Sequence, residues 1–298
     1  MATRILIYRM GAFGDTLLLA LLFKQLHTHY ENPHITLAAN PNYAAPLLDS
    51  GLIHETLDGG SRPFHLLYNE QPQENDALYR LIAHYDKSMF YTSDISGELF
   101  KRLNSKGLDN CHIHPPFPPA SDEIHICEWM MRPWPFLSVP VSEKFRLKPS
   151  KRNLILADEI LNQYRINGNF FFIHPGGGGK NKWIPSQILT TIVRRHSDET
   201  GQRPVVIEGP ADSVASEEFQ RFWGDSIPIF RDIQPKVLSA LLSKSSAYFG
   251  GDSGVSHLAS LYATHATVLY GSDSNMRVWR PAGSGTQCIP WETNKGLR

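Results

Sequence analysis

Three segments of the sequence place glycines and polar side chains directly after a short apolar run. They are Gly11–Asp15, Pro175–Trp183 and Gly250–His257. Glycine lets the backbone approach a ligand closely, and the start of a following helix offers unpaired N–H groups and the positive end of the helix dipole. Segments of this kind are typical of sites that bind phosphate groups or other anions.

The first segment contains Gly11, Gly14 and Asp15. Its glycines are spaced as GxxG rather than GxGxxG, so the usual dinucleotide-binding fingerprint is absent. Asp15 would stand at the carboxyl end of a strand, where a carboxylate can take part in chemistry on a bound ligand. The alternative is that Asp15 only caps the following helix, which its position alone favours.

The second segment contains consecutive glycines and two lysines. Gly177, Gly178, Lys180 and Lys182 can surround a diphosphate with backbone N–H groups and ammonium charge. The segment is not a P-loop, because neither lysine is followed by the Ser or Thr of the GxxxxGK[ST] pattern. The alternative is a flexible surface loop with solvated lysines, and the segment by itself favours neither interpretation.

The third segment combines acidic, hydroxyl and glycine residues at a predicted turn between a strand and a helix. Ser253 and Gly254 would present a hydroxyl and backbone N–H groups to an anion, and Asp252 can accept hydrogen bonds from sugar hydroxyls. The alternative is that Asp252 or Ser253 caps the helix. For His257 we favour an ordinary helical role over ligand binding.

The elements that must position these segments repeat a strand, a glycine-rich turn and a helix in both halves of the chain. Strands are expected over residues 5–8, 34–39, 64–68, 87–91, 109–114, 170–174, 204–208, 248–250 and 266–270. Helices are expected over residues 16–30, 41–50, 121–134, 153–164 and 257–262, and from residues 185 and 212 onward. A polar linker after a proline-dense stretch predicts a domain boundary near residue 150.

A fourth strand end, Tyr270–Ser274, adds Ser272 and by itself indicates only a turn. Four such segments in two halves are more informative, because ligands of open α/β sheets bind beyond the carboxyl ends of the strands. We therefore expect an α/β protein with two domains whose parallel sheets face each other across a cleft.

The bulk composition excludes several classes of protein. The formal net charge is zero, so no global field attracts nucleic acid, which we do not expect as a partner. Cys111, Cys127 and Cys288 form no CxxC pair, which indicates a reducing compartment without a zinc site or disulfides. The apolar run before Arg9 is too short for a signal peptide, and no run approaches the roughly 18 apolar residues of a membrane span. We expect a soluble cytoplasmic protein, at most peripheral to a membrane.

Five stretches of the chain together resemble one known family. They are RMGAFGDTLLL, PGGGGKNKWIP, GGDSGVSHLAS, VLYGSDS and WRP, and they resemble the glycosyltransferases of family 9, the lipopolysaccharide heptosyltransferases. The stretches occur in the family's order and cover both ends of the chain, whereas residues 59–125 show no alignment. The acidic glycine turn DSGxxHLA is the most specific part of the resemblance.

The resemblance implies a GT-B fold with two Rossmann-like domains, an acceptor-binding domain over residues 1–150 and a nucleotide-sugar-binding domain over residues 151–298. It implies an inverting glycosyltransferase without a metal or a cofactor, because the nucleotide-sugar is itself a substrate. The donor would be ADP-heptose, and the acceptor a lipopolysaccharide core or another cell-surface glycan at the cytoplasmic face of the inner membrane. The family's C-terminal helix would be shortened or absent after Trp291.

The resemblance also implies roles for individual residues. Asp15 would be the general base that deprotonates the acceptor hydroxyl as this group attacks the anomeric carbon. The family's phosphate-binding lysine corresponds to Lys180 or Lys182, and Asp252 would contact the donor sugar or its ribose. The acceptor-side loop would contain Gly11 and Gly14, and the remaining donor-side residues would be Gly177, Gly178, Ser253, Gly254, His257 and Ser272.

The sequence departs from the family where Ser253 and Ser272 replace the frequent threonine. Two other functions stay open at this point. One is a nucleotide-sugar-binding protein without catalytic activity. The other is a GT-B sugar epimerase, which would convert a donor without any acceptor.

Overall fold

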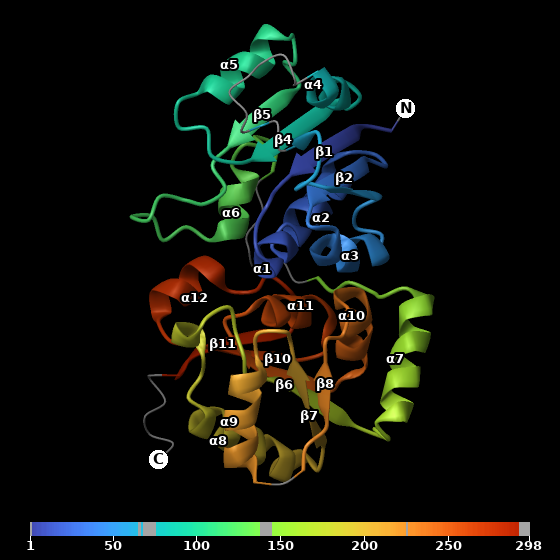
Figure 1. Ribbon diagram of the computed structural model, residues 1–298, viewed down its shortest axis with the longest axis vertical. Helices are drawn as coiled ribbons and strands as arrows, with labels where there is room; N and C mark the ends of the chain where they lie inside the picture. The colour runs from blue at the N-terminus through green and yellow to red at the C-terminus, as the bar shows by residue number, and fades with distance from the viewer. Residues whose placement is uncertain (1, 65–66, 68–75, 138–144, 225, 292–298) are drawn as a thin grey trace. The chain divides into compact units, whose positions relative to one another are not determined.

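The computed structural model describes residues 2–64, 67, 76–137, 145–224 and 226–291 (Figure 1). The chain divides into two compact units, Met1–Val141 and Ser142–Arg298. The sequence placed the boundary near residue 150. In the structure, residues 145–147 hydrogen-bond within the second unit, where the N–H of Leu147 donates to the carbonyl oxygen of Leu261 at 2.8 Å.

Unit 1 contains a parallel sheet of five strands in the order β3-β2-β1-β4-β5. The strands are β1 (Arg4–Tyr8), β2 (His34–Ala39), β3 (Glu55–Asp58), β4 (Lys87–Tyr91) and β5 (Cys111–His114). The helices are α1 (Phe13–Leu17), α2 (Ala20–His29), α3 (Pro41–Asp49), α4 (Asp76–Ala83), α5 (Glu98–Ser105) and α6 (Ile126–Met131). The central strand β1 is buried on both faces after Arg4, as expected for a parallel sheet covered by helices.

Unit 2 contains a parallel sheet of six strands in the order β11-β10-β9-β6-β7-β8. The strands are β6 (Phe170–His174), β7 (Arg203–Glu208), β8 (Ile229–Arg231), β9 (Ala247–Gly251), β10 (Ala266–Tyr270) and β11 (Thr286–Pro290). The helices are α7 (Lys151–Gln163), α8 (Ser186–Thr200), α9 (Ser213–Trp223), α10 (Pro235–Lys244), α11 (Gly254–Tyr262) and α12 (Asp273–Trp279), with the short 3-10 helix η3 (Lys180–Lys182).

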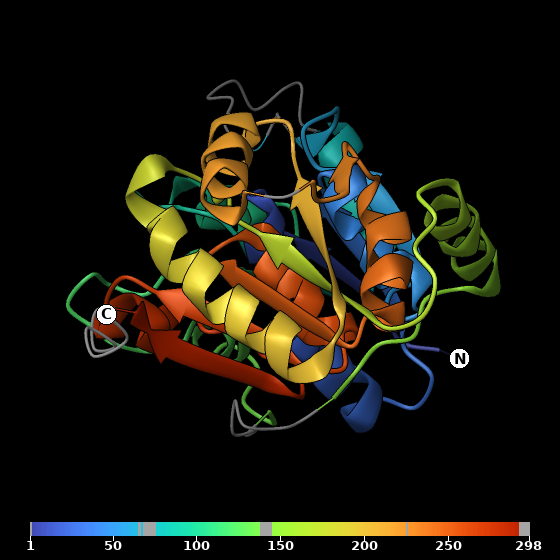
Figure 2. The same ribbon diagram turned by 90° about the horizontal axis from the view of Figure 1, so that it is seen from below.

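The core of unit 2 forms because β6 is apolar on both faces until its last residue. Every residue of β6 is buried, and Phe171 and Ile173 belong to one core cluster with Leu189 of α8 and Phe219 of α9. Side chains alternate across a strand, so Phe170 and Phe172 face the opposite side of the sheet. Figure 2 shows α8, drawn in yellow, in front of the strands, and α9 packs against α8. The sheet is thus enclosed, and polar chemistry is concentrated where its strands end.

Three expected elements differ from the structure. The expected helix over residues 16–30 is divided into α1 and α2, since the chain bends at Leu18 and Leu19 while both keep right-handed helical dihedrals. The expected helix over residues 121–134 is shortened to α6. It begins only at Ile126, because His125 caps it by accepting the N–H of Cys127 at 3.2 Å.

The expected strand over residues 64–68 is wrong where it can be compared. Phe64 lies in a short helical turn, and its ring stacks on the Tyr8 ring with the centroids 5.2 Å apart. The apolar side chain therefore covers one face of the sheet instead of extending it. Residues 65, 66 and 68 lie outside the described residues. In the described part of the chain, no helix is long and apolar enough to cross a membrane.

Candidate functional site

Asp15 lies in the first turn of α1, directly after β1 and the turn that follows it. Its Oδ2 accepts a hydrogen bond from the backbone N–H of Ala12 at 2.9 Å. A Cβ on Gly11 would come within 2.8 Å of Asp15 Oδ2, so glycine leaves the room that the carboxylate needs. Gly14 is buried in the same helix. Asp15 thus serves the start of the helix, as the capping alternative predicted, while its side chain stays 16% exposed.

The guanidinium of Arg9 lies beside this carboxylate. The Arg9 side chain is 1% exposed, and its Nη2 is 3.9 Å from Asp15 Oδ1. Its Nη1 donates to the carbonyl oxygen of Pro116 at 2.8 Å, and the guanidinium lies over the Phe117 ring. Burial lowers the pKa of Arg9, and the negative charge of Asp15 opposes that shift. Since arginine stays protonated in proteins, Asp15 faces a fixed positive charge.

In unit 2, the segments that the sequence singled out meet at one edge of the sheet. Strands β6, β9 and β10 are parallel neighbours. Their carboxyl ends lead into the glycine segment after His174, into Asp252 and Ser253, and into Ser272. This convergence follows the rule that open α/β sheets place their ligand sites beyond the carboxyl ends of the strands.

An ion pair joins the glycine segment to the acidic turn. Lys182 Nζ is 2.8 Å from Asp252 Oδ2, with the two side chains 42% and 10% exposed. Gly177 lies against the same turn, because a Cβ there would be 3.5 Å from the carbonyl oxygen of Asp252. Lys180 is exposed, and its Nζ lies over the Trp183 ring, 5.9 Å from the centroid. Of the two lysines that the sequence left open, Lys182 is the one that contacts Asp252.

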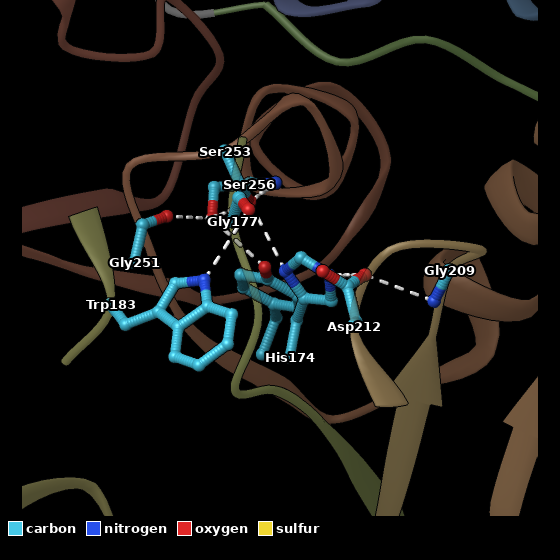
Figure 3. Close-up of polar contacts among 9 residues, drawn as sticks. His174, Gly177, Trp183, Gly209, Asp212, Gly251, Ser253 and Ser256 are labelled. Carbon is cyan, nitrogen blue, oxygen red and sulfur yellow. Dashed lines mark hydrogen bonds and ion pairs between the residues drawn. The ribbon is translucent and has the colours of Figure 1, made fainter. Parts of the chain in front are cut away.

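Three buried side chains form a hydrogen-bonded chain next to this ion pair (Figure 3). His174 Nε2 is 2.9 Å from Asp212 Oδ2, and His174 Nδ1 is 3.1 Å from Ser253 Oγ. The residues come from the end of β6, the start of α9 and the start of α11. Their exposed fractions are only 2%, 7% and 8%. The chain therefore links three strand ends inside unit 2.

Asp212 anchors the glycine segment to the rest of the unit. The N–H of Gly209 donates to Asp212 Oδ2 at 3.0 Å, and the N–H of Gly177 also donates to the carboxylate. Burial would raise the pKa of Asp212, but the hydrogen bond from His174 and the two N–H groups outweigh this effect and lower the pKa. Gly176 passes so close that a Cβ would overlap the carboxylate. Asp212 is therefore an ionised group around which the glycine segment folds.

Ser253 caps α11, as one of the alternatives from the sequence predicted. Its Oγ accepts the N–H of Ser256 at 3.2 Å. The Ser256 hydroxyl donates to the carbonyl oxygen of Gly251 and lies 2.8 Å from the Tyr248 hydroxyl. Burial raises the pKa of Tyr248 far above its ordinary value, so this hydroxyl keeps its proton. A hydroxyl network thus continues the chain from Asp212 into the base of α11.

The other predicted donor-side residues lie around this cluster. Gly254 is the first residue of α11, and His257, in the next turn, is 6% exposed. Ser272 caps α12, where its Oγ accepts the N–H of Asn275 at 3.4 Å. A Cβ on Gly178 would meet nothing within 4 Å, so this glycine lies on the open side of its loop.

Sequence reasoning missed Asp212 and Arg9 as site residues and gave His174 no role. A signal for Asp212 was present, because it follows β7 across Gly209, the same pattern of strand, glycine and acid as in the recognised segments. Arg9 directly follows the apolar strand β1, at the carboxyl end of the sheet, where ligands of open α/β sheets bind. Among the residues that the structure describes, no group of His, Cys, Asp or Glu side chains could hold a metal ion.

The sequence matches neither a protein-family model nor a curated protein. Comparison with solved structures does find similar folds. A glycosyl transferase of family 9 from Veillonella parvula has a TM-score of 0.72 at 15% identity, over 97% of this chain and 87% of that chain. The E. coli ADP-heptose lipopolysaccharide heptosyltransferase II has a TM-score of 0.70 at 18% identity, over 96% and 90%.

The E. coli heptosyltransferase WaaC with ADP has a TM-score of 0.65 at 13% identity, over 97% of this chain and 93% of that chain. The protein therefore has the fold of a family 9 glycosyltransferase and of two heptosyltransferases. The resemblance that the sequence motifs indicated is confirmed at the level of the fold.

Proposed function

We propose that this protein is a glycosyltransferase, which moves a sugar from a nucleoside diphosphate to a hydroxyl group of a glycan acceptor. The observation that carries the proposal is the meeting of Lys182, Asp252 and the start of α11 at one edge of the six-stranded sheet. An ammonium group and a helix N-terminus stabilise a diphosphate, which is the leaving group of this reaction. The fold shared with three glycosyltransferases supports the same class of reaction.

The donor side is assigned from the contacts in unit 2. Lys182 binds the diphosphate, and it can do so at little cost because its ion pair with Asp252 is partly exposed and such pairs are weak. Asp252 then accepts hydrogen bonds from hydroxyls of the donor sugar or the ribose. Ser253 and Gly254 line the diphosphate at the start of α11. Lys180, on the exposed side of the loop, has the smaller effect of the two lysines.

Asp15 is the general base of the proposed reaction. The acceptor oxygen bonds to the anomeric carbon while the bond from that carbon to the phosphate oxygen breaks, and the acceptor proton passes to the Asp15 carboxylate. Because this is a single displacement, the anomeric configuration inverts. A positioned base contributes about 100- to 10,000-fold to such a rate. The proposal includes the GT-B arrangement, in which residues 1–150 bind the acceptor and residues 151–298 bind the donor.

For the substrates, we propose ADP-heptose as donor and a lipopolysaccharide core or another cell-surface glycan as acceptor. Two of the structures with this fold support the choice, since one is named as an ADP-heptose heptosyltransferase and the other was solved with ADP. The proposed reaction needs no metal, because Lys182 and the start of α11 supply the positive charge. Its proposed place is the cytoplasmic face of the inner membrane.

The test of this function follows ADP-heptose by NMR with and without a heptose-deficient lipopolysaccharide core oligosaccharide. We expect donor consumption and a new anomeric signal of inverted configuration only when the acceptor is present, and the same rate with a chelator. Conversion of the donor without acceptor would instead indicate an epimerase. Binding without turnover under either condition would indicate a nucleotide-sugar-binding protein.

A thermal-shift series with ADP-, UDP-, GDP- and dTDP-glucose identifies the nucleotide. A ligand present at 100 times its Kd stabilises the folded state by about 2.7 kcal/mol. We expect the largest shift with the ADP-sugar and a smaller one in Lys182→Gln than in Lys180→Gln. The absence of a shift with all four compounds would contradict the proposed function.

A further inference from the structure

The buried chain of Asp212, His174 and Ser253 joins a carboxylate to the hydroxyl that caps α11 (Figure 3). An ionised carboxylate can only accept hydrogen bonds, so the Nε2 atom of His174 must carry the hydrogen that points to Asp212. The two N–H groups that also donate to Asp212, from Gly209 and Gly177, hold the carboxylate in this ionised form. The remaining question in the chain is which group donates between His174 Nδ1 and Ser253 Oγ.

The answer depends on the protonation of His174. In the neutral imidazole Nδ1 is an acceptor, so the Ser253 hydroxyl donates inward and its hydrogen cannot reach a ligand. In the imidazolium Nδ1–H donates to Ser253 Oγ, which already accepts the N–H of Ser256. The Ser253 hydrogen must then turn elsewhere, toward Ser256 Oγ at 3.2 Å or toward an anion at the start of α11.

The charged and titratable groups around His174 favour the second state when an anion is bound. From the start of α9, Asp212 faces Nε2 and stabilises an imidazolium. From β9, Tyr248 joins the network as a neutral hydroxyl, because burial raises its pKa. The ion pair of Lys182 and Asp252 carries no net charge. From α11, His257 is a second buried titratable group near the start of the helix. A diphosphate would add negative charge to this site, and His174 is the group whose carboxylate partner, Asp212, is placed to hold an added proton.

The same three residue types form the catalytic triad of many hydrolases. The backbone of Ser253 argues against that role, since φ is −151° and ψ is 162°, an ordinary extended conformation rather than a strained nucleophile turn. Its hydroxyl also caps α11, which holds it at the start of this helix. The geometry therefore favours a binding role for the chain over a nucleophilic one.

We propose that binding of a nucleoside diphosphate sugar is coupled to the uptake of one proton by His174, which acts as a positioning residue. Asp212 holds the imidazolium, and the imidazolium releases the Ser253 hydroxyl hydrogen for the diphosphate. The proton comes from the buffer on binding and returns to it when the nucleotide leaves, so no covalent step is involved. This inference rests on the proposed function, because it requires a diphosphate at the start of α11.

The experiment is titration calorimetry with whichever of ADP-, UDP-, GDP- or dTDP-glucose shifts thermal unfolding. These compounds lack a phosphate monoester, whose ionisation near pH 6 would add protons of its own. Titrations in buffers of different ionisation enthalpy count the protons. For the wild type we expect uptake of up to about one proton per ligand and a Kd that rises up to about tenfold per pH unit.

Variants separate the proposal from a structural role. His174→Gln can keep an amide between the same partners but cannot take a proton, so we expect its Kd to lose the pH dependence and its proton uptake to vanish. Asp212→Asn, which removes the partner of the imidazolium, has the same expected result. His265→Gln is the matched control, because His265 is exposed in unit 2 and should leave the wild-type uptake unchanged.

Two results would overturn the inference while leaving the proposed function standing. One is binding by the wild type without proton uptake, a result that does not depend on whether any variant folds. The other is wild-type uptake that persists in His174→Gln. If none of the four compounds binds, the proposed function fails and the inference fails with it.

Discussion

Gly176 is the position where one added methyl group should disturb the candidate donor site most. It lies in the glycine segment after β6, and a Cβ there would overlap the carboxylate of Asp212. Either the segment or the carboxylate must move in Gly176→Ala. The same loop provides a matched control, since a Cβ on Gly178 would meet nothing within 4 Å and neither glycine has a positive φ.

The expected cost follows from these contacts. Forcing a methyl group into a filled space costs about 1–3 kcal/mol. If the carboxylate moves, a charge-assisted hydrogen bond to His174 or to a loop N–H is weakened, and such a bond contributes about 1.5–3 kcal/mol. Movement of the carboxylate relieves the steric overlap with the added methyl group, so the two costs do not add in full. We therefore expect Gly176→Ala to lower the free energy of unfolding by about 2–4 kcal/mol. Gly178→Ala should change the free energy of unfolding by less than about 0.5 kcal/mol.

Calorimetric unfolding of the two variants and the wild type measures this difference. For a unit of this size the loss corresponds to a fall in Tm of about 5–15 °C. In the background of Asp212→Ala, where the carboxylate is gone, Gly176→Ala should cost much less, so the double-mutant cycle should show strong coupling. Equal effects of Gly176→Ala and Gly178→Ala, or strict additivity with Asp212→Ala, would refute the reasoning.

Three further predictions concern catalysis, donor binding and acid stability. Asp15→Asn keeps an oxygen for the start of α1 but no base, so kcat should fall about 100- to 10,000-fold at unchanged donor Kd. Asp94→Asn, which alters another carboxylate that accepts N–H groups at a helix start, should leave kcat unchanged in the same transfer assay, and equal losses would exclude Asp15 as base. Lys182→Gln should raise the donor Kd about 10- to 100-fold in calorimetry, since a hydrogen bond from a charged group contributes about 1.5–3 kcal/mol. Lys180→Gln should have the smaller effect, and the reverse order would contradict the assignment. Because the folded-state pKa of Asp212 lies below the ordinary value of 3.8, its stabilisation is complete above that pH and is lost as the pH falls through the folded pKa. Urea unfolding should therefore show that the stability difference between wild type and Asp212→Asn shrinks in acid, and a growing difference would oppose this view.

The sequence predicts the central strands well because buried strands consist of recognisable apolar runs. Strands β2, β4, β6 and β10 have the expected bounds, since strands covered on both faces read as apolar runs between polar turns. The short strand β8 (Ile229–Arg231) has too few residues to show such a pattern. The edge strand β11 was missed for another reason: its residues are only partly buried, so they do not form an apolar run.

The residues of the candidate site likewise fall into those that the sequence reveals and those that it does not. Asp15, Lys182 and Ser253 stand in local motifs, so residue type and spacing were enough to single them out. The chain through His174 and Asp212 depends on which strands are neighbours, because β7, β6 and β9 must lie side by side to bring the three residues together. Strand order is a property of the whole sheet, and no short segment of the sequence contains it.

The strand order of unit 2 has a consequence for biosynthesis. Strand β6 pairs on one side with β7, its next strand in the chain, but on the other side with the distant β9, where Phe171 pairs with Ala247. During translation, one edge of β6, which contains three consecutive phenylalanines, therefore stays unpaired until β9 has left the ribosome. Parallel pairings of such long sequence separation form slowly, and an unpaired aromatic edge invites aggregation. We expect nascent chains truncated before β9 to depend on chaperones, whereas chains that include β9 can pair this edge of β6 without them.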